Sequence, residues 1–196
     1  MKIAVLTVGA YQTNCYLVWQ EERTDCVVID PGYVPEKILE TVRQQGKTVA
    51  AILLTHGHFD HVGGVKEMAK ETGCPVFLRP EEKELPEIMT AGSLYCTDHY
   101  GESLTVAGLA FTVLHTPGHT PGSVCLLCED VLFSGDTLFA GSCGRTDFPG
   151  SDPAEMARSL NKLALLPGDY QVFPGHGEAT ILSYERKQNP YLRGVL

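Results

Sequence analysis

Apolar and β-branched residues gather into short runs along the first third of the chain, with turn residues between them. Three such runs predict successive β-strands: Lys2–Val8, Thr13–Trp19 and Asp25–Ile29. The third run stops sharply at Asp30-Pro31-Gly32. A continuous apolar run over Val49–Leu54 predicts a strand that is buried on both faces, and it leads the chain directly into His56.

Two segments of this half have helical spacing instead. The first begins at Pro35, which suits the first turn of a helix, and ends at Gly46. Its apolar positions form a single stripe: Ile38, Leu39 and Val42. Val65–Thr72 predicts a second helix, which Gly73 terminates. The periodicity breaks down between residues 80 and 101, and such a long irregular segment in a compact domain is usually functional or mobile.

The second half follows a similar outline. Apolar runs predict four more strands: Leu109–Leu114, Ser123–Leu127, Val131–Phe133 and Tyr170–Phe173. Asp152-Pro153 is a strong helix start, and Ile181–Lys187 predicts a final helix. This order favours an α/β fold in which two mixed β-sheets pack face to face with helices on the outer faces, an αββα sandwich. We expect a single compact domain over residues 1–196.

Composition narrows the class of protein. The net charge of −9 and the lack of a basic stripe argue against a nucleic-acid partner. Neither a signal segment nor an apolar run of membrane-spanning length is present, so we expect no membrane partner. The seven scattered cysteines predict a reducing cytoplasm rather than a disulfide framework. Cys125 and Cys128 have metal-site spacing, but within a strand they would point to opposite faces as two buried thiols. A monomer and a weak homo-oligomer both remain open.

The candidate chemistry lies in a cluster of metal donors. Residues 55–61 read Thr-His-Gly-His-Phe-Asp-His, and three further donors sit in loops beside glycines after strand-like runs. The full set is His56, His58, Asp60, His61, His119, Asp136 and His176. One structural zinc needs four ligands, whereas this set suffices for two divalent ions. Imidazole and carboxylate donors suit zinc best, with iron or manganese possible. A histidine-rich surface turn or a purely structural metal clip is the simpler alternative.

These residues resemble the metallo-β-lactamase superfamily, and the likeness covers nearly the whole chain. Its glyoxalase II-like hydrolases resemble it most, through Asp60, Asp136 and the loop over residues 141–148, which persulfide dioxygenases share. The resemblance implies that His56, His58 and His119 hold one metal, that Asp60, His61 and His176 hold the other, and that Asp136 bridges them. It also implies hydrolysis of a thioester, most plausibly a 2-hydroxyacyl-glutathione, by attack of a metal-bridging hydroxide. Asp60 and Asp136 are then the catalytic carboxylates, with Asp60 orienting the hydroxide.

Four further residues have candidate roles around this site. Asp30 could accept an N–H from a ligand histidine and fix its tautomer, or could simply form the turn before Pro31. Arg145 matches a glutathione-binding residue of the family and could hold an anionic substrate tail; a salt bridge to a nearby aspartate is the alternative. Tyr95 and Tyr100 could line the substrate entrance, or could be ordinary loop aromatics.

Some departures from glyoxalase II leave the substrate open. We expect a short form without the family's C-terminal helical domain, and Asp147 and Glu178 replace two tyrosines that contact glutathione. The acyl group and the thiol carrier therefore do not follow from the resemblance. A persulfide dioxygenase with one iron is the alternative enzyme. A non-catalytic metal-binding module is the alternative outside enzymes.

Overall fold

Two six-stranded sheets form the centre of the molecule in a computed structural model, which describes residues 1–90 and 92–193. The first sheet has the order β1 (Lys2–Val8), β2 (Thr13–Trp19), β3 (Asp25–Ile29), β4 (Thr48–Leu53), β5 (Val76–Leu78) and β6 (Asp98–His99). The second has the order β14 (Thr180–Ile181), β13 (Gln171–Pro174), β10 (Val131–Gly135), β9 (Val124–Cys128), β8 (Leu109–His115) and β7 (Ser103–Val106). Both sheets mix parallel and antiparallel pairs.

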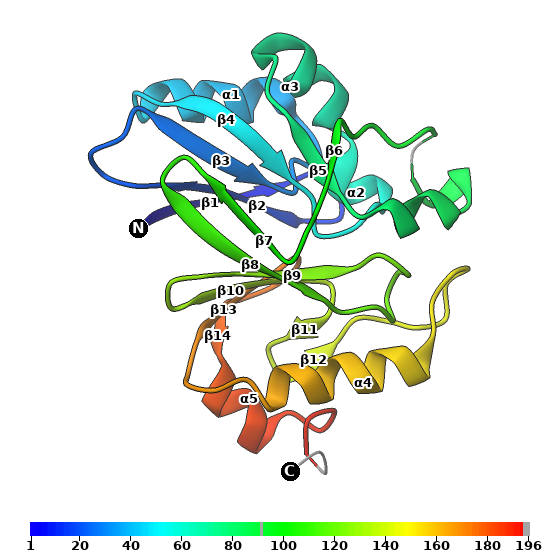
Figure 1. The fold of residues 1–196 in the computed structure, drawn as a ribbon. Coiled ribbons are helices and arrows are strands. Elements are labelled where there is room, and N and C mark those ends of the chain that lie inside the picture. Colours follow the sequence, from blue (N-terminus) through cyan, green and yellow to red (C-terminus); the bar gives the residue numbers. More distant parts are fainter. Residues whose placement is uncertain (91, 194–196) are drawn as a thin grey trace.

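Helices cover the outer face of each sheet (Figure 1). On the first sheet lie α1 (Pro35–Gln44) and α3 (Val65–Thr72); on the second lie α4 (Pro153–Ala164) and α5 (Leu182–Gln188). The remaining short elements are α2 (Phe59–Val62), two 3₁₀ helices at Pro80–Glu84 and Glu87–Met89, and the hairpin of β11 (Leu138–Phe139) and β12 (Ser142–Cys143). The predicted αββα sandwich is confirmed.

Alternation along the strands divides the core into three layers. In β3, Cys26 and Val28 face the α1 and α3 helices, whereas Val27 and Ile29 face the second sheet. The layer between the sheets contains large buried side chains such as Phe111 and Phe133. In β9, Cys125 packs under α4 and α5 while Cys128 packs between the sheets, so the opposite orientation expected of these two thiols is confirmed. All seven cysteines are free.

Strands from both sheets end at one edge of the sandwich. β3 and β4 run parallel, β10 and β13 run parallel, and β8 has the direction of β10 because β9 is antiparallel to both. Their carboxyl ends therefore lead into loops that carry Asp30, His56, His119, Asp136 and His176. This topology gathers residues that are more than 100 positions apart in the chain.

The predicted element boundaries agree with the structure where the sequence pattern is long. The bounds of β1, β2, β3 and α3 are those predicted from the sequence. Five strands of two to four residues, β6, β7, β11, β12 and β14, were not predicted, since such short runs show no clear alternation. Among the helices of the described residues, none is both long and apolar enough to cross a membrane.

Candidate metal centre

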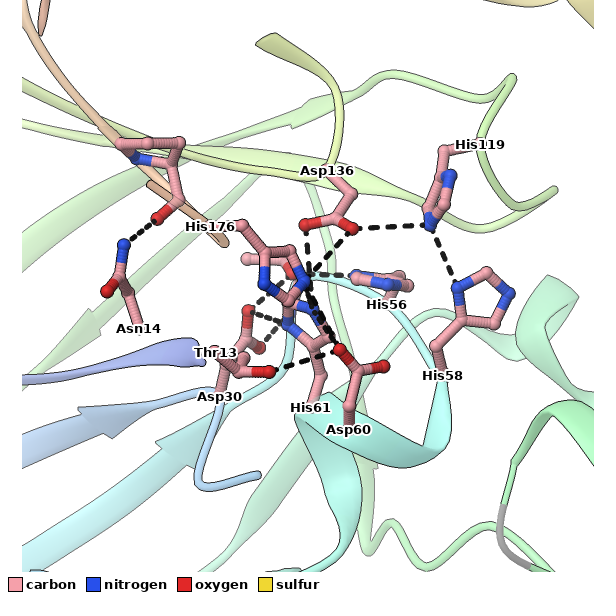
Figure 2. Close-up of polar contacts among 12 residues, drawn as sticks. Thr13, Asn14, Asp30, His56, His58, Asp60, His61, His119, Asp136 and His176 are labelled. Atoms are coloured by element: carbon pink, nitrogen blue, oxygen red, sulfur yellow. Dashed lines mark hydrogen bonds and ion pairs between the residues drawn. The ribbon is translucent and has the colours of Figure 1, made fainter. Parts of the chain in front are cut away.

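The seven donors predicted from the sequence converge on one small region between the two sheets' edge loops (Figure 2). The first sheet's side supplies His56 and His58, together with Asp60 and His61 from within α2. The second sheet supplies the rest: His119, Asp136 and His176. The described residues contain three sets of potential ligands whose donor atoms lie within 4.8 Å of one another: His56, His58 and His119; Asp60, His61 and His176; and Asp30, His56 and His61. The first two sets form the adjacent first and second donor groups.

Asp136 lies between these two groups. Its Oδ2 is 3.5 Å from His119 Nε2 in the first group and 3.5 Å from His176 Nε2 in the second. Its Oδ1 is 3.5 Å from His61 Nε2. Within the first group, His58 Nδ1 is 2.9 Å from His119 Nε2. A carboxylate with one oxygen near each group is the arrangement that a pair of bridged cations requires.

The donor set fits two divalent cations by a test that is independent of the resemblance. Three buried atoms have no hydrogen-bond partner among the described residues: His56 Nε2, His58 Nε2 and Asp136 Oδ1. Burying unpaired polar atoms is costly, so native proteins rarely leave several together without a ligand. Nitrogen and carboxylate donors without a thiolate suit zinc, iron or manganese.

Outer hydrogen bonds orient four of the five donor histidines, whereas His58 has none among the described residues and turns its Nδ1 towards His119. Asp30 Oδ2 is 2.9 Å from His61 Nδ1 and also accepts the Thr55 hydroxyl at 2.6 Å. The Thr55 oxygen is in turn 3.0 Å from His56 Nδ1. Because the Thr55 proton is committed to Asp30, that oxygen accepts an N–H from His56. One buried carboxylate thus sets the tautomer in both groups, with Nε2 left as the inward lone pair.

The other two Nε2 donors are held in the same manner by main-chain carbonyls. His119 Nδ1 lies 2.9 Å from Arg145 O, and His176 Nδ1 lies 3.1 Å from Tyr11 O. Thr13 donates to Asp60 Oδ2 at 3.0 Å. These contacts orient the donors before any cation is present, which lowers the cost of ordering them on binding.

The start of β2 also fastens the His176 loop to the first sheet. The Asn14 amide nitrogen Nδ2 donates to Pro174 O at 3.1 Å (Figure 2). It also donates to Gly177 O at 2.9 Å, on the other side of the histidine. The Asn14 backbone N–H donates to Gly175 O at 2.7 Å. Both sheets are therefore joined at the point where their donors meet.

Burial keeps His56 and His58 of the first group neutral. It lowers the pKa of His58 to about 3, with His119 adding to the effect, and it lowers the pKa of His56 well below its ordinary value. Both imidazoles consequently offer free lone pairs at neutral pH, which is the protonation state that metal binding needs.

In the second group, His61 instead carries a proton at neutral pH when no cation is bound. Burial lowers the pKa of His61, but Asp136, Asp30 and Asp60 outweigh it and raise that pKa to about 9. Burial raises the pKa of Asp60, yet the contacts with His176 and His61 hold it well below its usual range. A cation entering this group must displace the His61 proton, so its binding releases a proton.

Two glycines permit the close approach of these loops. A Cβ on Gly175 would lie 2.2 Å from Asp136 Oδ1 and 2.7 Å from His61 Cε1. A Cβ on Gly144 would lie 1.8 Å from Asp136 O. No side chain fits at either position without displacing Asp136, so the loops depend on glycine there.

A cavity of about 400 Å³ opens onto the donors. Its floor includes His58, Asp60, His119, Asp136 and His176. Its apolar walls come from both halves of the chain: Tyr11, Phe59, Met89, Phe139 and Phe148. Such a volume, with apolar walls and few polar groups, is typical of a small-molecule site.

Arg145 lines this cavity as predicted, but its charge is already paired. Its guanidinium makes two hydrogen bonds to Asp147, at 2.6 and 2.7 Å, and lies over the Phe148 ring at 3.9 Å from the centroid. The salt bridge to a nearby aspartate is therefore present, and binding of an anionic substrate tail by Arg145 stays a prediction.

The two tyrosines expected at the entrance lie elsewhere. Tyr100 packs in the core between the sheets, and its hydroxyl donates to Leu54 O at 3.1 Å, so its expected role at the entrance is wrong. It follows directly after β6, whose pairing with β5 carries it into the core. Tyr95 lines a separate, smaller cavity beside α3, together with Lys66 and Ser93, and not the cavity over the donors.

Sequence analysis missed Thr55, Thr13 and Asn14. Thr55 stands directly before the first donor, which is a usable signal because a ligand histidine almost always bonds its other ring nitrogen to an oxygen acceptor nearby. Thr13 and Asn14 sit at the start of an ordinary strand, and nothing in their local sequence distinguishes them. Their role arises only from the approach of the second sheet.

Comparison with known proteins gives full-length matches. The family model described as the metallo-beta-lactamase superfamily matches residues 8–88 and 97–176. Hydroxyacylglutathione hydrolase GloC of Haemophilus influenzae is 34% identical, with 98% of each chain covered. The crystal structure of the B3 metallo-beta-lactamase BLEG-1 is 35% identical at a TM-score of 0.91, covering 98% of this chain and 100% of that one. The crystal structure of TTHA1623 in a di-iron-bound form is 39% identical at a TM-score of 0.83, covering 96% and 100%.

Proposed function

Since this chain belongs to the metallo-beta-lactamase superfamily and has clustered His/Asp metal sites, we propose that it is a binuclear metallo-hydrolase that cleaves a thioester. A 2-hydroxyacyl-glutathione is the leading substrate, in keeping with the likeness to GloC of Haemophilus influenzae. The observation that carries the proposal is Asp136, which stands between two donor groups on the floor of one cavity.

The residues present divide between two cations. His56, His58 and His119 would hold one, Asp60, His61 and His176 would hold the other, and Asp136 would contact both. When bound, the two cations supply Lewis acidity towards a carbonyl oxygen and lower the pKa of water enough for hydrolysis near neutral pH. The related protein TTHA1623 is described in a di-iron-bound form, which supports two ions rather than one.

Asp60 is placed to direct the attacking water. In the described part of the chain, its hydrogen bond with Thr13 and its ion pairs with His61 and His176 all involve Oδ2. Its Oδ1 is therefore the oxygen available to a water in the cavity, where it can accept a hydrogen bond and aim a lone pair at the substrate.

A thiolate leaving group suits a cavity whose walls are largely aromatic and apolar. Phe59, Phe139 and Phe148 surround the donors, and none of these side chains can act as a general acid. A thiolate is a better leaving group than an amine, because a thiol has a pKa near 8.5. Since Asp147 already pairs with Arg145, we expect weak binding of the glutathione carboxylates and hence a high KM.

Two other activities form distinct outcomes. Asp60, His61 and His176 alone are a two-histidine, one-carboxylate set, which would serve a mononuclear-iron persulfide dioxygenase. The likeness to BLEG-1, a B3 metallo-beta-lactamase, makes a β-lactam the other candidate substrate. The metal count separates the first from a binuclear hydrolase, and the substrate panel separates the second.

The test combines metal analysis with turnover. Purified protein is analysed for zinc, iron and manganese, and assayed with S-lactoylglutathione, a chromogenic cephalosporin and glutathione persulfide with oxygen uptake. We expect two ions per chain and thioester hydrolysis. Asp136→Ala should lose bound metal and lower turnover at least about 100-fold, because it removes a donor and not only a supporting contact. Asp130→Ala, an exposed aspartate just before the same strand, is the matched control and should retain both.

Contradicting results are equally specific. One tightly bound iron with oxygen uptake would establish the dioxygenase instead. Faster turnover of the cephalosporin than of the thioester would replace the proposed substrate. Full metal loading without turnover of any of the three compounds would favour a non-catalytic metal-binding module.

A further inference from the structure

Glu82 is a buried carboxylate outside the cavity that contacts two donor-bearing loops at once. It ends the first turn of the 3₁₀ helix Pro80–Glu84, and its side chain is inaccessible to solvent. Oε2 accepts the Gly57 N–H at 2.5 Å, and Oε1 accepts the Gly122 N–H at 2.6 Å. The segment that carries it is the long irregular one, residues 80–101, for which the sequence predicted a role through Tyr95 and Tyr100 but none for Glu82.

Each of these glycines lies beside donors of the first group. Gly57 stands between His56 and His58, and Gly122 lies three residues after His119. The carboxylate therefore spans the two loops that must approach each other for the three imidazoles to meet. No other described side chain accepts hydrogen bonds from both of these loops.

The glycines leave space that Glu82 occupies. A Cβ on Gly57 would lie 2.9 Å from Glu82 Oε2, and a Cβ on Gly122 would lie 2.7 Å from Oε1. The side chain is consequently held between two stretches of backbone, with one oxygen for each. A bidentate acceptor of this kind fixes the separation of the loops as well as their hydrogen bonding.

Burial destabilises the charged form of this carboxylate. It raises the pKa of Glu82 to about 7, although the hydrogen bonds from Thr120, Gly57 and Gly122 act in the opposite direction. The described residues place no lysine or arginine in ion-pair contact with it. An apolar side chain would avoid the desolvation cost but would leave two buried amides without an acceptor. The contacts to the two loops are thus what the carboxylate contributes.

We propose that Glu82 is a positioning residue for the metal centre, which holds the His56–His58 loop against the His119 loop so that these imidazoles bind a cation tightly. The inference rests on the metal centre of the proposed function, but not on its substrate. A residue that only stabilises the fold would leave both metal affinities unchanged, whereas removal of the Glu82 carboxylate should weaken one metal site selectively.

The test measures the two metal affinities separately in Glu82→Gln. Glutamine keeps the size of the side chain but presents a donor to one of the two N–H groups, so one contact is lost. Competition between the full-length protein and a chromophoric zinc chelator should show one of the two equivalents bound about 10–100-fold more weakly, as for other residues that support ligands. The second equivalent should be unchanged. The zinc-induced rise in Tm should shrink accordingly.

Glu185→Gln is the matched control. Glu185 is also fully buried and accepts Gly141 N–H at 2.8 Å and the Thr180 hydroxyl at 2.6 Å, but neither partner belongs to a donor-bearing loop. This variant should lower the Tm of the metal-free protein while both zinc affinities stay the same. If Glu82→Gln does not fold, Gly122→Ala displaces the carboxylate while retaining it and should weaken the same equivalent of zinc.

Two results would overturn the inference in different ways. If Glu82→Gln lowers the Tm of metal-free and zinc-loaded protein equally and leaves both affinities unchanged, Glu82 serves the fold alone, and the proposed function stands. If the wild-type protein binds no zinc, iron or manganese, the metal centre itself is wrong, and both proposals fail together.

Discussion

Replacing Asp30 by asparagine tests whether one buried carboxylate sets the tautomers of both donor groups. Asp30 is almost completely buried, and its backbone φ of 50° is one that aspartate and asparagine both tolerate, so the variant adds no backbone strain. The side chain accepts three hydrogen bonds, from Thr55 N at 2.8 Å, from the Thr55 hydroxyl at 2.6 Å and from His61 Nδ1 at 2.9 Å. Asparagine has one acceptor oxygen and one donor NH₂ group in their place.

Either orientation of the new amide removes part of this arrangement. With NH₂ at the Oδ2 position, His61 would have to accept through Nδ1 and carry its proton on Nε2, the nitrogen that faces the cations. With NH₂ at the Oδ1 position, the buried Thr55 N–H would lose its acceptor. Loss of such a supporting carboxylate weakens metal binding about 10–100-fold. This equals about 1.4–2.8 kcal/mol, or roughly 3–11 °C less metal-induced rise in Tm for a chain of this size.

Chelator competition and thermal unfolding, with and without zinc, measure both quantities. Thr55→Val separates the effect of Asp30 on His56 from its effect on His61. The variant removes the hydroxyl that connects Asp30 to His56 but leaves the contact between Asp30 and His61. We expect Asp30→Asn to weaken both equivalents of zinc and Thr55→Val to weaken one. Unchanged affinity of Asp30→Asn for both ions, together with an unchanged Tm of the metal-free protein, would refute the reasoning, since each orientation of the amide must lose either the His61 contact or the Thr55 N–H contact.

Three further predictions concern pH, loop packing and the fold. In the metal-free protein, His61 has a folded pKa of about 9 against an ordinary 6.5, so its contribution to stability is complete below pH 6.5 and is lost as the pH rises towards 9. The Tm of the metal-free protein should therefore fall between these pH values, and it should fall less with zinc bound. A flat Tm profile of the metal-free protein would contradict this protonation of His61. Gly175→Ala places a Cβ 2.2 Å from Asp136 Oδ1 and should reduce zinc affinity more than about 10-fold, by analogy with loss of a supporting contact. The control Gly101→Ala, whose new Cβ would have its nearest neighbour 3.9 Å away, should bind zinc normally. Equal zinc affinity of the two variants would count against this loop geometry. Asp152 caps α4 by accepting hydrogen bonds from the N–H groups of Ala154 and Glu155. Asp152→Ala should therefore lower the free energy of unfolding by about 1 kcal/mol and the Tm by roughly 2–4 °C, with zinc content unchanged. A change in zinc content would show that α4 affects the metal centre.

The elements that the sequence predicted well are those with long runs or clear end signals. β1 to β3 are runs of five to seven residues rich in apolar and β-branched side chains, and α3 ends at Gly73, whose φ of 68° suits a glycine cap. The strand β6 has two residues and no period of its own; it pairs because β5 offers it a free edge. The misplacement of Tyr100 has the same origin, since the pairing of β6 determines which layer the next residue enters.

The same contrast holds at the metal centre. The donor residues are recognisable in the sequence because cation binding restricts their chemical type and because the strand ends place them in short loops. The expected contact between Asp30 and a donor histidine is present. The contacts of Thr13, Asn14 and Glu82 had no such signal, as threonine, asparagine and glutamate at those positions would be equally suited to a solvent-exposed turn.

By itself, the sequence determined the αββα arrangement, the set of seven donors and the edge of the sheets where they gather. These features follow from the order of residues along the chain, the spacing of apolar positions and the chemistry of each side chain, all of which can be read from short stretches of sequence. The tertiary structure alone decided which nitrogen of each histidine faces inward, which aromatic side chains line the cavity, and that Glu82 reaches two loops 25 and 40 residues away. Those features depend on how two sheets pack against each other, and contacts between residues so far apart leave no periodic trace in the chain.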